Sequence, residues 1–192
     1  MMQTGKTIHL IRHGQSAFNA AGLKPGGEDP MLFDAALSDL GHRQVAEARR
    51  QVADLACDLV VTTPLTRALQ TCLGLFDGRR VAIMVDSRAR EKLSHSCDVG
   101  RPPAALQSDF PNLSFGHLAE CWWYAGPDHA GGPWDGVIRR EPEAHFMTRV
   151  GDFRRWLHGR PEPAVTVVGH SDFFKALSGR SLENCEVYEM KL

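Results

Sequence analysis

Cysteine is scarce in this sequence, and its placement excludes two common roles. No two cysteines form a C-x-x-C pair, which argues against a zinc site, and their odd number and wide spacing argue against a disulfide framework. We therefore expect reduced thiols in a cytoplasmic protein. The five cysteines are Cys57, Cys72, Cys97, Cys121 and Cys185.

Long apolar runs and an excess of charge are also missing. No run approaches the roughly 18 apolar residues of a membrane span, and the first residues lack the apolar core and cleavage site of a secretory signal. The chain carries 22 basic and 23 acidic residues, so its formal net charge is −1. This balance provides no general attraction to nucleic acid or to an anionic membrane, and we expect neither as a partner.

The sequence has no G-x-x-x-x-G-K-[ST] phosphate loop, which argues against a nucleotide triphosphatase. Its composition is that of an ordinary globular protein, with 43% hydrophobic and 23% charged residues among 192. We expect a single domain over residues 1–192. Much of the glycine and proline falls in a segment at about 94–136, which we predict to be an insertion that faces the substrate.

Short apolar segments predict strands at 7–11, 58–62, 81–85, 164–168 and, at an edge, 185–190. Helices are expected between them. Ser38 can cap the first helix and Thr63 the second, where Pro64 would occupy the first helical position. A short helix is expected near 104–110, a long one from Pro142 to Gly159, and a last one after Ser171. Apolar stripes at helical spacing support the first and the long helix: Val45, Ala48, Val52 and Leu55, and Phe146, Val150, Phe153 and Leu157.

Strands that alternate with helices predict a three-layer α/β/α sandwich with a mainly parallel central sheet. In such sheets ligands bind beyond the carboxyl ends of the strands. Three polar clusters follow predicted strands: Arg12-His13-Gly14, the stretch 62–67, and Gly169-His170-Ser171. We expect the fold to bring all three to one edge of the sheet.

Arginines in two of these clusters suit a phosphate ligand. A phosphate monoester carries close to two negative charges, and the planar guanidinium group donates paired hydrogen bonds to its oxygens. Arg12 lies beside Gly14, and Arg67 lies near the start of a predicted helix, so backbone amides are expected close to both.

The three clusters together resemble the histidine phosphatase superfamily, the phosphoglycerate mutase-like group (branch 1). The order and spacing of the blocks match over nearly the whole chain, beginning with the RHG motif, Arg12-His13-Gly14. The residues that carry the resemblance are Arg12, His13, Gly14, Ser16, Asn19, Thr63 to Ala68, Thr71, and Gly169 to Ser171.

The resemblance implies a role for each matching position. His13 resembles the nucleophile that accepts the phosphoryl group, and Arg12, Arg67 and His170 resemble the residues that bind its oxygens. Asn19 matches an asparagine that lines the same pocket. No metal and no cofactor is implied. The substrate would be a small phosphorylated molecule, and inorganic phosphate would be a product.

The leaving alkoxide needs a proton, which in the family comes from a carboxylic acid after the third strand. Glu91 stands in the matching place, although the Ala89-Arg90 that precedes it departs from the family's usual residues. Asp98 is a second candidate for the same role. The alternative for Glu91 is a surface ion pair with Arg90 or Lys92.

Other conspicuous residues have simpler interpretations. Trp122-Trp123-Tyr124 could line the substrate entrance, but so apolar a run favours the core. The remaining histidines of this region, His117, His129 and His145, lack the i,i+4 spacing of a helical metal site.

We hypothesise a phosphomonoesterase that forms a phosphohistidine on His13. A phosphoglycerate mutase and a non-catalytic phosphate-binding protein of the same fold are the alternatives. A mutase would add basic residues over the pocket, whereas residues 97–136 contain one basic residue other than histidine, Arg101. Sugar phosphates, phosphoamino acids and small organic phosphates all stay open as substrates. A homodimer is also open, because strand 185–190 could pair between subunits.

Overall fold

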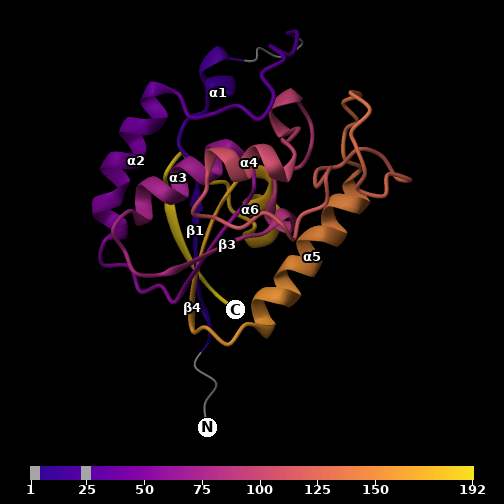
Figure 1. Ribbon diagram of the computed structural model, residues 1–192. Coiled ribbons are helices and arrows are strands. Elements are labelled where there is room, and N and C mark those ends of the chain that lie inside the picture. Colours follow the sequence, from indigo (N-terminus) through magenta and orange to yellow (C-terminus); the bar gives the residue numbers. More distant parts are fainter. Residues whose placement is uncertain (1–4, 23–26) are drawn as a thin grey trace.

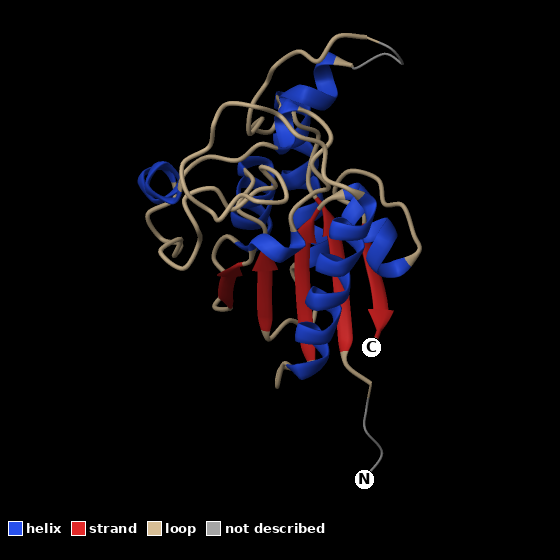
Figure 2. Cartoon of the chain, turned by 90° about the vertical axis from the view of Figure 1, so that its right-hand side faces the viewer, coloured by secondary structure: helices blue, strands red, loops and turns tan. Residues whose placement is uncertain are grey.

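A five-stranded sheet forms the centre of the computed structural model, which describes residues 5–22 and 27–192. The strand order is β3-β2-β4-β1-β5. The first four strands are parallel, and β5 runs antiparallel to β1. Figure 2 shows the parallel strands pointing toward one end of the molecule, where the long loops gather. The strands are β1 (Thr7–Arg12), β2 (Leu59–Thr62), β3 (Ala82–Val85), β4 (Ala164–Gly169) and β5 (Val187–Lys191).

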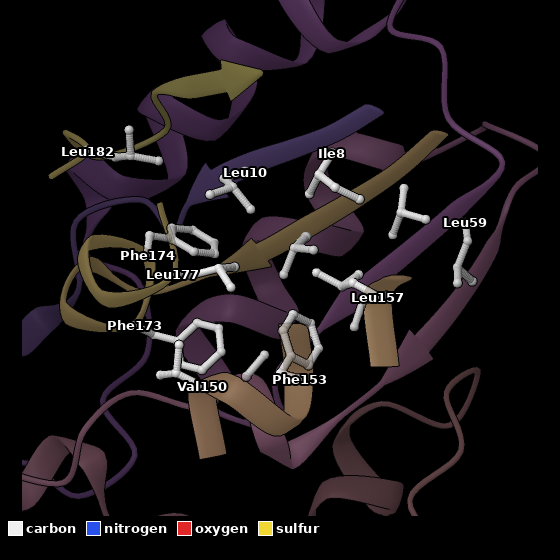
Figure 3. Close-up of a cluster of buried hydrophobic side chains, with 14 of the residues drawn as sticks. Ile8, Leu10, Leu59, Val150, Phe153, Leu157, Phe173, Phe174, Leu177 and Leu182 are labelled. Carbon is white, nitrogen blue, oxygen red and sulfur yellow. The ribbon is translucent and has the colours of Figure 1, made fainter. Parts of the chain in front are cut away.

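Helices cover both faces of the sheet (Figure 1). Apolar residues of α2 and α3 pack on one face against Ile11, Val60 and Val168. On the other face, α5 and α6 pack against alternate residues of the same strands, as Figure 3 shows for Ile8, Leu10 and Leu59. The helices are α1 (Ala17–Ala21), α2 (Asp39–Val52), α3 (Thr66–Phe76), α4 (Pro103–Asp109), α5 (Glu143–Gly159) and α6 (Ser171–Ser178), with 3₁₀ turns η1 (Ser87–Ala89) and η2 (Ser96–Asp98).

The α/β/α sandwich with a mainly parallel sheet is confirmed. All five predicted strands are present within two residues of the expected bounds, and the last lies at an edge as predicted. The helix capped by Ser38 and the long helix after Pro142 are also present, and each buries its predicted apolar stripe except for Leu55. Leu55 lies beyond the end of α2 at Val52, although it still packs against the same core.

The predicted start of the second helix is wrong by two residues. The helix α3 begins at Thr66 with Leu65 at the N-cap, so Thr63 is not the cap and Pro64 lies outside the helix. The Thr63 hydroxyl lies 2.7 Å from Nε2 of His170 instead. A contact to a residue distant in sequence has replaced the local capping bond, and the chain between β2 and α3 is longer as a result.

Most of segment 94–136 builds a second apolar core beside α3 and β3. The aromatic run belongs to this core, since Trp122, Trp123 and Tyr124 are 5%, 6% and 8% exposed. A close approach supports the packing: a Cβ on Gly100 would lie 2.0 Å from Cζ2 of Trp122, so a larger residue does not fit there. Among residues 5–22 and 27–192, no helix has the length and apolar character needed to cross a membrane.

Candidate active site

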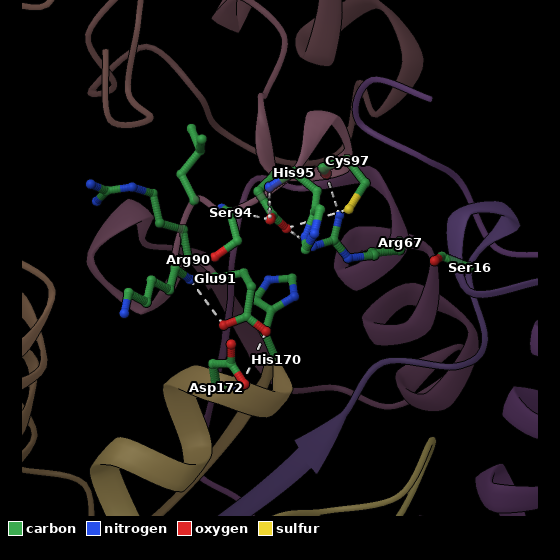
Figure 4. A network of polar contacts seen from close by, with 12 residues as sticks. Ser16, Arg67, Arg90, Glu91, Ser94, His95, Cys97, His170 and Asp172 are labelled. Carbon is green, nitrogen blue, oxygen red and sulfur yellow. Dashed lines mark hydrogen bonds and ion pairs between the residues drawn. The ribbon is translucent and has the colours of Figure 1, made fainter. Parts of the chain in front are cut away.

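The predicted polar clusters meet at the carboxyl end of the sheet, around a cavity of about 190 Å³. The fold brings there the ends of β1 and β4, the first turn of α3, and the loops that follow β1 and η1. Figure 4 shows how residues from these elements face one another. The polar side chains that line the cavity include Arg12, His13, Ser16, Asn19, Arg67, Glu91, Lys92, His95, Asp98 and Asp172.

His13 is buried, and its ring is held in one tautomer. Its Nδ1 lies 2.7 Å from the carbonyl oxygen of Gly14. A carbonyl can only accept, so Nδ1 carries the proton and Nε2 keeps a free lone pair. Arg67 Nε donates to that lone pair over 3.3 Å. Burial, and then the positive charge of Arg67, hold the pKa of His13 well below its ordinary value, so the imidazole is neutral at pH 7.

Gly14 is required by a close approach of two backbones. A Cβ at this position would lie 2.8 Å from the carbonyl oxygen of Gly41, in the first turn of α2. The Gly14 amide donates to the Thr71 hydroxyl over 3.1 Å, and that hydroxyl donates to the carbonyl of Arg67. The loop that carries His13 is therefore fixed to both α2 and α3.

Arg67 is a buried cation with a buried partner. Its Nη2 donates to Asp98 Oδ1 over 2.9 Å, and the two side chains are 3% and 5% exposed. Its Nη1 donates to the carbonyl of Cys97. The second oxygen of Asp98 accepts the backbone amides of Ser94 and His95, at 3.1 and 3.2 Å. Asp98 thus serves as the carboxylate that fixes Arg67.

Residues near the C-terminal end of the sequence hold Arg12 in place. Its Nη1 donates to the carbonyl of Leu182 over 2.8 Å, and its own carbonyl accepts the amide of Cys185. Asn184 Nδ2 donates to the carbonyl of His13 over 2.7 Å. Within the described part of the chain, Arg12 Nε has no hydrogen-bond partner. The guanidinium group therefore keeps a free donor.

His170 lies deeper than the other site residues. It is fully buried and stands at the N-cap of α6, with its ring centre 5.2 Å from that of His13. Its Nε2 contacts the Thr63 hydroxyl, whereas Nδ1 is buried with no partner among residues 5–22 and 27–192. Burial, followed by the charge of Arg67, holds the pKa of His170 well below its ordinary value.

Glu91 is bound by backbone amides at the start of α6. Its carboxylate accepts the amides of Asp172 and Phe173, at 3.1 and 3.0 Å, and that of Lys92 at 2.9 Å. Figure 4 shows Glu91, His170 and Asp172 close together there. Burial raises the pKa of Glu91 to about 7, and the negative charges of Asp98 and Asp172 add to the effect. Glu91 is therefore partly protonated near neutral pH.

The neighbours considered as ion-pair partners for Glu91 bind elsewhere. Arg90 pairs with Glu141, and Lys92 pairs with Glu143. Asp98, the second candidate for the acid, accepts from the cationic Arg67 and from two backbone amides, whereas Glu91 accepts from three neutral backbone amides.

Asn19 lines the cavity as expected, in a short helix that the sequence analysis did not predict. Its amide oxygen accepts the Ser16 amide, and the Ser16 hydroxyl accepts the Asn19 amide. This reciprocal capping pattern is the signal that could have identified α1. Phe18 and His95, which also line the cavity with their rings 5.5 Å apart, carry no such signal.

The other histidines of this part of the chain make separate contacts. His117 contacts the carbonyl of Val85, His129 that of Pro133, and His145 the carboxylate of Glu141. Within residues 5–22 and 27–192, no three His, Cys, Asp or Glu side chains gather as a metal ion would require.

Comparison with known sequences and structures gives the class of protein. The sequence profile of the histidine phosphatase superfamily (branch 1) matches residues 8–191. The chain therefore belongs to this superfamily. Two Arabidopsis thaliana relatives, a phosphoglycerate mutase-like protein and phosphoglycerate mutase-like protein 1, are 28% and 30% identical. These matches span 94% and 88% of this chain and 76% and 69% of theirs.

Relatives named as phosphatases are similarly close. A glucosyl-3-phosphoglycerate phosphatase from Mycobacterium tuberculosis is 27% identical over 93% of this chain and 76% of its own. A solved mycobacterial glucosyl-3-phosphoglycerate phosphatase with VO3 superposes with a TM-score of 0.62 at 21% identity, covering 96% of this chain and 92% of its own. The structure of a putative α-ribazole-5′-P phosphatase from Escherichia coli superposes with a TM-score of 0.64 at 17% identity. The match covers 98% of this chain and 91% of the other. The two structures share the fold, and the named relatives support an enzyme of the phosphatase or mutase type.

Proposed function

We propose that this protein is a phosphomonoesterase that transfers the phosphoryl group of a small ester to Nε2 of His13 and then to water. The observation that carries the proposal is the state of His13. Its proton is on Nδ1, its lone pair faces Arg67, and its ring lines a cavity whose other wall holds a carboxyl group with a pKa of about 7.

The first step needs a neutral nucleophile and fixed positive charge. Phosphoryl transfer has a loose transition state, so the protein contributes mainly positioning and charge stabilisation. Arg67 and Arg12 supply the charge, and the Arg12 Nε has no competing partner in the described part of the chain. This supports a mechanism in which two guanidinium groups bind the phosphoryl oxygens without a metal ion.

His170 can donate to the same oxygens while staying uncharged. If the Thr63 hydroxyl donates to Nε2, the proton of the neutral ring is on Nδ1, the atom that has no partner in the described residues. Both histidines then act in the neutral form that their lowered pKa values favour. We assign Thr63 the role of selecting this tautomer.

Glu91 supplies and later removes the proton. In the first step its carboxylic acid protonates the leaving oxygen as the P–O bond breaks and the P–N bond to His13 forms. In the second step the carboxylate takes a proton from the water that attacks phosphorus, and inorganic phosphate and neutral His13 are regenerated. Hydrolysis of an alkyl ester is expected to fall as the pH rises through about 7, where Glu91 loses its proton.

The pocket supports a phosphatase over a mutase. A mutase must bind a second phosphate, which requires further cations at the entrance. Arg101, the single basic residue other than histidine in 97–136, is bound to Asp34 and Asp109. Lys92 at the cavity wall is paired with Glu143. These pairings leave little positive charge for a second anionic group.

The test is phosphate release from a panel of monoesters in the presence of a chelator. We expect the wild type to be active and His13→Ala to be inactive, while His42→Ala, which alters an exposed histidine on α2, keeps full activity. The reaction of a substrate labelled in its phosphoryl group is quenched rapidly without acid. A labelled phosphoprotein should then be found in the wild type and in His42→Ala but not in His13→Ala.

The outcomes separate the candidate functions. Loss of activity on adding chelator would contradict the metal-independent mechanism. A phosphoprotein that returns its phosphate to a second substrate more readily than to water would favour a mutase. Binding of inorganic phosphate without turnover of any ester would favour a non-catalytic protein.

A further inference from the structure

A buried arginine on α5 contacts the backbone of Glu91 and of the residues just before it. Arg149 Nη1 donates to the carbonyls of Arg88 and Arg90, at 2.8 and 2.7 Å, and Nη2 donates to the carbonyl of Glu91 over 3.3 Å. The Arg149 side chain is 6% exposed. One guanidinium group therefore fixes three backbone carbonyls within four residues.

Glu141 completes the attachment. Its carboxylate is fully buried and accepts from Arg149 Nε at 3.1 Å and from Nη2 at 2.7 Å. The same residue exchanges backbone contacts with Leu93, whose carbonyl accepts the Glu141 amide over 2.8 Å and whose amide donates to a Glu141 oxygen over 3.3 Å. Residues 88–93 are thus bound to α5 and to Glu141, two residues before that helix, on both sides of Glu91.

Glu91 needs such an attachment because it lies outside any helix or strand. It follows η1, and its carboxylate must reach the amides at the start of α6 while remaining beside the cavity. Proton transfer demands a donor within hydrogen-bond reach of the leaving oxygen, and an error of about 1 Å can lower the rate by about 10²-fold.

We propose that Arg149, held by Glu141, is a positioning residue for the proton donor Glu91. The inference rests on the proposed function of Glu91. Arg149 touches neither substrate nor phosphate in this scheme, since its five N–H donors are already bound to Glu141 and to three backbone carbonyls. It acts by fixing the Glu91 main chain, and through it the distance between the carboxyl group and the leaving oxygen.

The charge of Arg149 is less important here than the shape of its guanidinium group. The planar fork has five donors in fixed directions, so it can bind carboxylate and carbonyl oxygens at once. A lysine keeps the charge that the buried Glu141 requires, but its single ammonium group cannot occupy all these positions. Arg149→Lys therefore isolates the positioning role with the ion pair retained.

The experiment compares two esters that differ in their need for a proton. p-Nitrophenyl phosphate releases a weakly basic phenolate that needs little protonation, whereas glycerol phosphate releases a strongly basic alkoxide. We expect Arg149→Lys to lower kcat/KM for glycerol phosphate by at least about 10-fold and for p-nitrophenyl phosphate by less than about 2-fold, because kcat/KM reports the phosphorylation of His13 and not the later hydrolysis step that both esters share. Glu91→Gln should show the same selectivity with a larger loss, and the double variant should be no slower than Glu91→Gln alone.

The controls address folding and local charge. Arg155→Lys makes the same change at an exposed arginine of the same helix, paired with Asp152, and should alter neither rate. The Kd of inorganic phosphate should be unchanged in Arg149→Lys, because the phosphate-binding residues are not altered. If Arg149→Lys does not fold, Glu141→Gln tests the same attachment and should show a smaller loss of the same selectivity.

Two different results would overturn the inference, one through the role of Arg149 and the other through the role of Glu91. Equal losses on both esters in Arg149→Lys, with a selective loss in Glu91→Gln, would show that Arg149 is merely structural. The absence of selectivity in Glu91→Gln itself would remove the proposed role of Glu91, and with it the reason to position that residue.

Discussion

Replacement of Glu91 by glutamine should stabilise the protein at alkaline pH, although it removes the proposed proton donor. Burial and the charges of Asp98 and Asp172 raise the pKa of Glu91 from 4.5 to about 7. The folded state therefore disfavours the ionised carboxylate relative to the unfolded state. Well below pH 4.5 the group is protonated in both states and carries no penalty. The penalty grows as the pH rises and is complete once the pH passes the folded-state pKa.

The size of the effect follows from the shift. One unit of pKa corresponds to about 1.4 kcal/mol, so the shift from 4.5 to about 7 corresponds to about 3 kcal/mol. By the same linkage the penalty is about 2 kcal/mol at pH 6 and about 3 kcal/mol at pH 8. Glutamine has the same shape but never ionises. Its altered hydrogen bonds to the three amides are independent of pH, so they shift the whole curve without changing its slope.

The assay is urea unfolding of wild type and Glu91→Gln at pH 4.5, 6 and 8 in buffers without phosphate. We expect the free energy of unfolding of the variant, relative to wild type, to rise by about 3 kcal/mol between the two extremes. Glu47→Gln makes the same change at an exposed position of α2 and provides the control. A flat difference for Glu91→Gln would refute the raised pKa and leave Glu91 ionised at neutral pH.

Two further predictions concern the neighbouring carboxylates. Asp172→Asn removes one of the negative charges that, after burial, raise the pKa of Glu91, so the alkaline limb of the kcat profile for an alkyl ester should move to lower pH; an unmoved limb would assign the shift to burial and Asp98. Asp98→Asn leaves the buried guanidinium of Arg67 without its carboxylate and should lower the free energy of unfolding by about 3–5 kcal/mol in urea titrations. Asp109→Asn breaks an exposed pair with Arg101 and should cost less than about 1 kcal/mol, and equal losses in the two variants would contradict the role of burial.

The sequence predicts the layers and the convergence of the site because both depend on local patterns. Apolar segments at strand length and stripes at helical spacing identify the elements, and polar residues directly after strands identify the edge where they meet. Arg12, His13, Arg67 and Glu91 all line one cavity, as the resemblance implied, and His170 lies beside His13.

The parts that escaped prediction depend on contacts between distant segments. Thr63 looks like a helix cap, but its hydroxyl meets His170, more than a hundred residues away in sequence. The pairing of Asp98 with Arg67 joins residues 31 positions apart, and no local pattern indicates it. Arg149 lies on α5 and Glu141 just before it, and nothing in the neighbouring sequence shows that the chain around Glu91 covers them.

The position of β1 has a consequence for folding during translation. Thr7 of β1 pairs with Ala164 on one side and Lys191 on the other, so the strand that leads into His13 is made before the other four strands and pairs only with the two that are made last. During translation β1 has no neighbouring strand to pair with until β4 has left the ribosome. The nascent chain can therefore neither bury this segment nor assemble a phosphate pocket before synthesis has passed residue 170, and pairing over such long separations is typical of slow folding.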